Sequence, residues 1–260
     1  MNQVMDVILG RKSVRTYEDR PILDAAKEDI LRAAMRSPTA GNMMLYSIIE
    51  VRDPAAKLTL ARTCDDQPFI AKAPLVLLFL ADYQRWVDYF IHSGVEELCA
   101  ERGDSMRRPE EGDLMLACCD ALIAAQTAVI AAESLGIGSC YIGDIMENYE
   151  AHRDLFSLPQ FVFPICLLCF GYPTQQQENR LQTTRFEKEF VVFEDRYRRL
   201  SADEFAAMYR RDEEQAARSR SLPEGVKNTG QWMYSRKFNA GFSQEMNRSV
   251  RAMMRAWVGK

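Results

Sequence analysis

Residues 114–135 restrict the fold more than any other segment of this sequence. They are dominated by Ala, Leu, Ile and Val over the length that a helix needs to cross a bilayer. Asp120 and Gln126 fall within the segment, and a charge in the middle of a membrane is costly. We therefore interpret it as a helix buried in the protein or in a subunit interface, and expect no membrane association. Asp113 is expected to cap this helix and Gly136 to end it.

Four segments have the composition of strands. Residues 75–80 are an uninterrupted apolar run, which predicts a central strand covered on both faces. Residues 46–51, 139–142 and 161–170 are further strand candidates, and Pro164 is expected to disturb the last of them. Helices and strands do not alternate in the strict order that a parallel sheet needs. We therefore expect an α+β fold with a central, mainly antiparallel sheet flanked by helices.

The character of the chain changes beyond Pro173, where charged and polar residues become frequent. A charged helix is expected near residues 203–219, followed by a Gly/Pro/Asn loop and a final helix with an apolar stripe. The stripe consists of Met246, Val250, Met253, Met254 and Trp257. We divide the chain into a core of residues 1–181 and a C-terminal extension of residues 182–260. The extension is expected to pack on a partner subunit as a dimer arm and to form a lid over the pocket.

Charge and cysteine usage restrict the function. The chain has 33 Lys and Arg against 37 Asp and Glu, a net charge of −4 that argues against binding to nucleic acid. Its seven cysteines are an odd set scattered through apolar stretches, as is typical of reduced core thiols. No secretory signal is recognisable near the amino terminus. We therefore expect a cytoplasmic protein.

Histidines and cysteines give little support to a catalytic triad or a metal site. The sequence has two histidines, His92 and His152, and neither lies near an acidic or cysteine motif. Cys166 and Cys169 have C-x-x-C spacing, but in a strand their sulfurs would point to opposite faces. We therefore expect no bound metal.

The segment Gly10-Arg11-Lys12-Ser13-Val14-Arg15 is the sharpest local signal. On an extended backbone alternate side chains share a face, so Arg11, Ser13 and Arg15 would present two guanidinium groups and a hydroxyl to one spot. This arrangement suits a phosphate monoester. Charge-assisted hydrogen bonds contribute about 1.5–3 kcal/mol each, a good part of the roughly 12 kcal/mol that nanomolar binding needs. The alternative is an ordinary solvated basic surface.

Two small-residue segments are weaker signals. Residues 37–42 form a loop after a helix, where the backbone can approach a flat ligand and Thr39 and Asn42 can bond amide edges. The alternative is an ordinary turn. Residues 136–143 are glycine-rich between a helix and a strand, but they lack the strand-first order of a dinucleotide fingerprint.

Taken together and in this order, with Phe170-Gly171-Tyr172-Pro173 after them, the three motifs resemble the nitroreductase family, and in detail its flavin reductase/NADPH nitroreductase branch. The resemblance runs from about residue 4 to about Leu181 and is faint from residue 182. It implies a homodimer with two FMN molecules at the subunit interface, each held by residues of both chains.

The resemblance also implies which residues bind the cofactor. Arg11, Ser13 and Arg15, with Lys12 between them, match the FMN phosphate clamp, which Arg180 joins. The other matching residues are Thr39, Gly41 and Asn42 for ribityl and ring from the other subunit, Gln67 for the pyrimidine edge, and Tyr141, Ile142, Gly143 and Asp144 near the reactive N5. The chain departs from the branch at Glu178, where a lysine is usual, and at Asp144, where a second glycine is frequent.

By the same resemblance the protein is an FMN-dependent oxidoreductase that uses NADPH or NADH to reduce small electrophilic acceptors, such as nitroaromatics, quinones or free flavin. We expect ping-pong turnover and no catalytic side chain, because the flavin carries the chemistry. Basic residues are predicted around the pocket mouth, some meeting nicotinamide phosphates, with solvated surface charge as the alternative. They are Arg210, Arg211, Arg218, Arg220, Arg236 and Lys237.

Two alternatives stay open. One keeps FMN but changes the chemistry, to reductive dehalogenation or flavin fragmentation. The other is a flavin-binding protein without turnover. Neither the acceptor nor the choice between NADH and NADPH follows from the sequence.

Overall fold

A computed structural model of the chain describes residues 2–219 and 222–259. The chain divides into two compact units, of which unit 1 holds the residues up to Arg180 and those from Glu245 onward, and unit 2 is Leu181–Gln244. The strands are β1 (Tyr46–Glu50), β2 (Leu75–Asp82), β3 (Gly138–Ile142) and β4 (Val162–Gly171). The helices are α1 (Gln3–Gly10), α2 (Asp24–Met35), η1 (Ala40–Asn42), α3 (Pro54–Thr63), α4 (Phe69–Lys72), α5 (Gln84–His92), α6 (Val95–Glu101), α7 (Glu111–Ser134), η2 (Gly143–Met146), α8 (Tyr149–Phe156), α9 (Gln175–Glu178), η3 (Lys188–Phe190), α10 (Ala202–Ser219), α11 (Thr229–Met233), η4 (Tyr234–Phe238) and α12 (Gly241–Val258).

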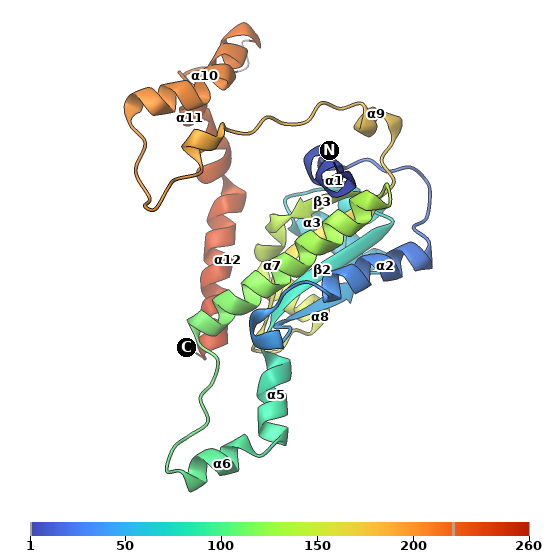
Figure 1. The fold of residues 1–260 in the computed structure, drawn as a ribbon, viewed down its shortest axis with the longest axis vertical. Coiled ribbons are helices and arrows are strands. Elements are labelled where there is room, and N and C mark those ends of the chain that lie inside the picture. Colours follow the sequence, from blue (N-terminus) through green and yellow to red (C-terminus); the bar gives the residue numbers. More distant parts are fainter. Residues whose placement is uncertain (1, 220–221, 260) are drawn as a thin grey trace. The chain divides into compact units, whose positions relative to one another are not determined.

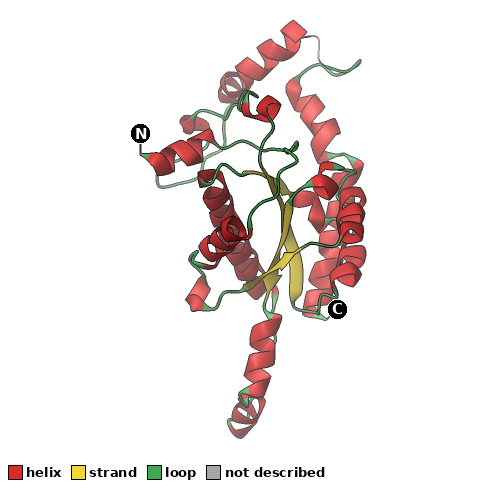
Figure 2. Cartoon of the chain, turned by 90° about the vertical axis from the view of Figure 1, so that its right-hand side faces the viewer, coloured by secondary structure: helices red, strands yellow, loops and turns green. Residues whose placement is uncertain are grey.

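The sheet of unit 1 has the strand order β1-β2-β4-β3, and all neighbouring strands are antiparallel. The expected α+β class is therefore confirmed. Helices cover both faces of the sheet (Figures 1 and 2). The register shifts where Phe79 faces Cys166 but Leu80 faces Pro164. Proline has no N–H for the ladder, which explains this bulge at the predicted point.

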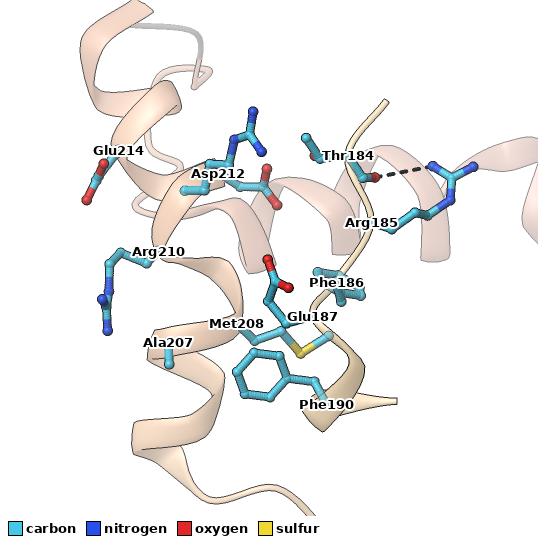
Figure 3. Close-up of a pocket in the computed structure, with 11 residues that line it drawn as sticks. Thr184, Arg185, Phe186, Glu187, Phe190, Ala207, Met208, Arg210, Asp212 and Glu214 are labelled. Carbon is cyan, nitrogen blue, oxygen red and sulfur yellow. Dashed lines mark hydrogen bonds between the residues drawn. The ribbon is translucent and has the colours of Figure 1, made fainter. Parts of the chain in front are cut away.

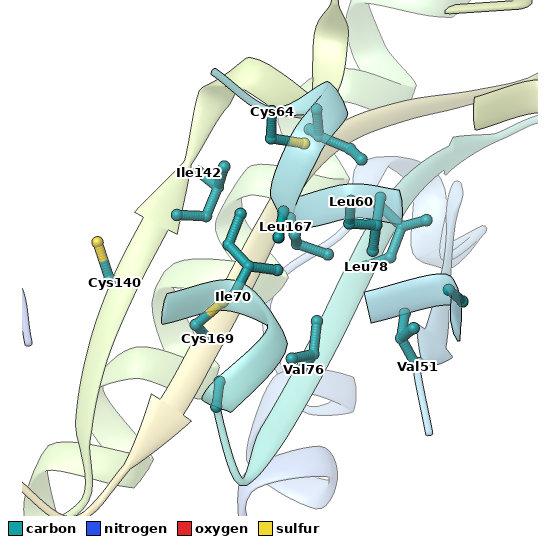
Figure 4. Close-up of a cluster of buried hydrophobic side chains, with 14 of the residues drawn as sticks. Val51, Leu60, Cys64, Ile70, Val76, Leu78, Cys140, Ile142, Leu167 and Cys169 are labelled. Atoms are coloured by element: carbon teal, nitrogen blue, oxygen red, sulfur yellow. The ribbon is translucent and has the colours of Figure 1, made fainter. Parts of the chain in front are cut away.

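Strand β2 is buried along its whole length, as its apolar run predicts. Its alternate residues Leu75, Leu77 and Phe79 pack with α2 and α7. The residues between them pack with α3 and α4 on the other face, in the cluster that Figure 4 shows. Cys166 and Cys169 lie in these two different clusters, so their predicted placement on opposite faces of the sheet is confirmed.

Helix α7 packs against α2 and the sheet (Figure 1). Within the described residues it is the one helix long and apolar enough to cross a membrane, and its contacts are those expected of a core helix. The prediction that Asp113 is its N-cap is wrong, because Glu110 occupies that position. Asp113 is the third helical residue, and its carboxylate accepts the Glu110 N–H at 2.9 Å in a capping box.

The final helix α12 is docked on the core of unit 1 through the second half of its predicted stripe. Met253 and Trp257 are fully buried, whereas Met254 is 40% exposed. The Trp257 ring meets Phe161 edge-on at 5.5 Å, and its Nε1 donates to the Glu110 carbonyl at 3.1 Å. The extension predicted from residue 182 is thus divided, since the chain from Glu245 onward belongs to unit 1. Its roles as dimer arm and lid stay predictions.

Candidate functional site

The clamp segment, which we define as residues 11–15, lies along strand β3. Ser13 forms a parallel bridge with Ser139, and the Val14 N–H donates to the Ser139 carbonyl at 2.9 Å. Val14 is buried against Gly138. A Cβ added to Gly138 would lie 2.5 Å from Val14 Cγ2. The clamp segment therefore reaches β3 because position 138 carries no side chain.

The side chains of the clamp segment alternate as the sequence predicts. Lys12 Nζ donates to the backbone carbonyls of Glu178 and Arg180, the latter at 2.8 Å. Arg11, Ser13 and Arg15 instead lie close enough to Cys140 to affect its thiol: burial raises the pKa of Cys140, and these three side chains oppose that rise. These effects on one thiol are those expected if two guanidinium groups and a hydroxyl share one side of the segment.

Helix α9 and the residues after it hold the clamp segment from a second direction. An Arg180 guanidinium nitrogen donates to the Ser13 carbonyl at 2.6 Å, and the Arg15 N–H donates to Gln177 Oε1 at 3.3 Å. Arg180 therefore lies beside the clamp, where the resemblance implied it. Lys12 binds the backbone carbonyl of Glu178. The presence of glutamate at position 178, where the family branch usually has lysine, therefore does not affect this hydrogen bond.

Gln67 and Asp144, both predicted at the flavin ring, contact each other. Gln67 Nε2 donates to Asp144 Oδ2 at 2.8 Å and to the Cys64 carbonyl at 3.0 Å. Asp65 and Asp66 adopt positive φ angles of 56° and 47° in the turn before Gln67, and Asp144 follows β3 in η2. The structure thus brings one amide and one carboxylate together from distant parts of the chain.

The remaining residues predicted near N5 lie at the end of β3. The Tyr141 hydroxyl donates to Gln126 Oε1 at 3.3 Å, so this side chain is engaged with α7. Ile142 is buried in the core on the other face. Gly143 is exposed, and a Cβ added to it would meet nothing within 4 Å. Gly143 is therefore the residue of this stretch with open space for a flat ligand.

Residues 39–42 of the predicted loop are fixed to helix α7 by Asp120. The Thr39 hydroxyl and the Leu45 N–H donate to Asp120 Oδ2, the second at 3.1 Å, and the Ala40 N–H donates to Oδ1 at 3.0 Å. Gly41 has a φ of 57°, in the left-handed region that favours glycine. One sequence signal points to this anchor: Asp120 is a carboxylate within an otherwise apolar helix.

Within one chain the loop and the clamp lie apart. The loop precedes β1 and the clamp lies beside β3, and these are the two edge strands of the sheet. Along α7 the loop is bound at Asp120, whereas Ser139 beside the clamp bonds Glu133. A rise of about 1.5 Å per residue puts roughly 20 Å between these two helix positions. A single chain therefore does not bring both groups to the same end of one ligand.

Glu147 is a buried carboxyl group behind Asp144 that the sequence analysis did not find. Its side chain lies in the core with Oε1 shielded from solvent and without a hydrogen-bond partner among the described residues. Burial, together with the carboxylates of Asp144, Asp65 and Glu245, raises the pKa of Glu147 to about 8. No sequence spacing signals this, because the neighbours come from three separate segments.

We expect Glu147→Gln to remove a pH dependence of stability. The folded protein holds a proton on Glu147 that the unfolded chain releases, so stability falls as pH rises from about 4.5 to about 8 and is flat above. The variant should gain on the wild type by about 4 kcal/mol between pH 5 and pH 8.5 in urea unfolding, because each unit of pKa difference contributes about 1.4 kcal/mol. Glu150→Gln is the control, because Arg248 lowers the pKa of Glu150 to about 2. A Glu147→Gln difference that is the same at both pH values contradicts the prediction.

Unit 2 contains a cavity of about 520 Å³ between α10 and residues 184–190 (Figure 3). Arg210 and Arg211 line it with Arg185, but so do three carboxylates. Of the other predicted basic residues, Arg218 pairs with Glu214. Arg236 lies over the Trp232 ring and Lys237 over the Phe242 ring. Arg220 lies outside the described residues. The mixed charge of this lining does not favour a phosphate group.

The described residues contain no group of three His, Cys, Asp or Glu side chains arranged to hold a metal ion. His152 is buried, with Nε2 at 2.8 Å from the Thr63 hydroxyl and Nδ1 at 2.9 Å from the Ile145 carbonyl. Both ring nitrogens are therefore used within the core, and burial lowers the pKa of the imidazole.

The fold and the site define an α+β protein with an antiparallel sheet and a basic segment docked on an edge strand. A family model described as Nitroreductase family matches residues 8–172. The chain belongs to the nitroreductase family.

Two relatives and one solved structure illustrate the likeness. The chain is 30% identical over 200 residues to an "Oxygen-insensitive NADPH nitroreductase" of Salmonella typhimurium, covering 77% of each protein. It is 29% identical over 235 residues to an "FMN reductase [NAD(P)H]" of Bacillus subtilis, covering 90% of each. The structure of B. megaterium NfrA2 superposes with a TM-score of 0.81 at 24% identity over 99% of this chain and 98% of that one, and supports the fold alone. This likeness includes the extension, into which the 235-residue alignment to the B. subtilis protein also reaches.

Proposed function

We propose that this protein is an FMN-dependent NAD(P)H oxidoreductase that reduces small electrophilic acceptors such as nitroaromatics, quinones and free flavin. Relatives with the names FMN reductase and NADPH nitroreductase support the class of enzyme. The observation that supports the proposal is the docking of a basic segment on β3 through Ser13, with the Arg180 guanidinium on the Ser13 carbonyl between Arg11 and Arg15 in the chain.

The residues of this site fit FMN. A phosphate monoester needs several charged donors, and the clamp supplies two guanidinium groups and a hydroxyl. Gln67 offers an amide for the pyrimidine edge, while Asp144 accepts one of its protons and fixes its orientation. Gly143 leaves room for the ring. When bound, FMN supplies hydride and electron transfer, and the chain holds and orients it.

A second copy of the chain completes the site in this proposal. The loop with Thr39, Gly41 and Asn42 is bound at one part of α7 and the clamp lies near the other, so the loop meets the flavin of the partner. Apolar side chains exposed on α1 and α7 support such an interface. They are Val4, Ile8, Leu9, Met115, Leu116, Leu122 and Ile123.

Turnover by the ping-pong route follows from one ring face serving both substrates in turn, with NADPH or NADH as donor. The seven cysteines are all free thiols, which supports the reducing cytoplasm as the location. Other flavin chemistry, dehalogenation or flavin fragmentation, and flavin binding without turnover are the rival functions.

Spectroscopy and kinetics of the purified protein test the proposal. We expect a yellow dimer, loss of NAD(P)H absorbance with a quinone or a nitroaromatic, and parallel double-reciprocal lines. A colourless monomer that takes up no added FMN would refute the proposal. Flavin binding without NAD(P)H consumption across the acceptor panel would instead favour a binding protein, and intersecting lines would reject only the ping-pong route.

A further inference from the structure

We infer that Asp120 is a positioning residue of the flavin site, and that Thr39 acts with it: the carboxylate on α7 holds the loop of residues 39–42 in the shape that the partner's flavin meets. This inference rests on the proposed function. It concerns the hydrogen bonds that Asp120 accepts from the loop, and not a contact between Asp120 and the cofactor.

Asp120 closes the loop from both ends. Its Oδ1 accepts the Ala40 N–H at 3.0 Å at the start of the loop, and its Oδ2 accepts the Leu45 N–H at 3.1 Å just after it. The side chain is only 3% exposed, and no basic side chain forms a salt bridge with it among the described residues. A buried carboxylate is tolerated only with its lone pairs satisfied, so the loop and Asp120 depend on each other.

Thr39 links the carboxylate to the far end of the loop. Its hydroxyl donates its one proton to Asp120 and accepts the Met44 N–H at 2.8 Å. No proton of this hydroxyl is left to donate to a ligand. Thr39 therefore shapes the loop, and its hydroxyl can meet the flavin only as an acceptor.

The loop backbone needs such an external support. Gly41, Asn42 and Met44 have φ angles of 57°, 58° and 49°, and the left-handed region is unfavourable for residues with a side chain. From the outer side Arg85 donates to the Met44 and Tyr46 carbonyls at 2.5 and 2.9 Å. Without Asp120 the Thr39 hydroxyl and the N–H groups of Ala40 and Leu45 would lose their common acceptor. The loop would then relax from this shape.

Flavin affinity and the spectrum of bound flavin test the inference. Asp120→Ala should weaken FMN binding at least tenfold, and Thr39→Val several-fold, in titrations that follow FMN fluorescence. In both variants the visible band of bound FMN should shift toward that of free FMN. Thr39→Ser keeps the hydroxyl and should match the wild type in both measurements. Should Asp120→Ala not fold, the Thr39 pair carries the test.

Asp53→Ala is the matched control. Asp53 also accepts two backbone N–H groups, of Ala55 at 3.1 Å and Ala56 at 3.2 Å, but at the start of α3. It should lower thermal stability without changing FMN affinity or the spectrum. Wild-type affinity and spectrum in Asp120→Ala or Thr39→Val would overturn the inference, as would Thr39→Ser behaving like Thr39→Val. If the wild type itself binds no FMN, the proposed function fails and this inference falls with it.

Discussion

Replacing Arg11 and Arg15 together by methionine is expected to weaken FMN binding at least 100-fold. Both guanidinium groups act on the Cys140 thiol, whose pKa burial raises and their positive charge lowers. Charge-assisted hydrogen bonds contribute about 1.5–3 kcal/mol each, and about 1.4 kcal/mol corresponds to a tenfold change in affinity. Methionine keeps an unbranched side chain of comparable reach, so the loss is mainly one of charge and donors.

Equilibrium titration of the apoprotein with FMN measures this effect, and Lys12→Met is the matched control. Lys12 belongs to the same basic run, but its ammonium group binds the carbonyls of Glu178 and Arg180 on the other side. Its removal should cost less than tenfold in affinity. A double variant that binds FMN within threefold of the wild type, or a Lys12→Met loss as large as that of the double variant, would show that the clamp is misassigned.

The sheet could be predicted because its signals are local. The run at residues 75–80 specifies a strand buried on both faces whatever its neighbours are, and Pro164 breaks the ladder by its own chemistry. The alternation of Arg11, Ser13 and Arg15 also follows from backbone geometry alone. The N-cap of α7 was misjudged because Glu110 and Asp113 are both acidic and each caps the other.

The supporting residues of the site could not be predicted, because their roles depend on distant segments. Asp120 binds residues 75 to 81 positions away in the chain. The raised pKa of Glu147 arises first from its burial and then from the carboxylates of Asp144, Asp65 and Glu245, and both the burial and the approach of Asp65 and Glu245 exist only in the folded chain. Lys12 resembles its neighbours in sequence, and only the position of α9 separates its role from theirs.

Gly138→Ala is expected to displace the clamp segment and to weaken FMN binding about tenfold, with a stability loss of about 1–3 kcal/mol. The new Cβ would lie 2.5 Å from Val14 Cγ2 and 2.9 Å from Val14 Cβ. Val14 is held there by its N–H bond to the Ser139 carbonyl, so relief of the clash moves the backbone that carries Ser13 and Arg15. FMN titration and thermal unfolding measure the two effects.

A second substitution distinguishes this steric mechanism from a direct contact of Gly138 with the ligand. Val14→Ala removes the two methyl groups nearest to the new Cβ, so the double variant should recover part of both losses, and the coupling between the two sites should be clearly non-additive. Gly112→Ala is the control, because a Cβ there meets nothing within 4 Å. Additive losses in the double variant would reject the steric mechanism. The position of the clamp segment would then not depend on the close contact between Val14 and Gly138.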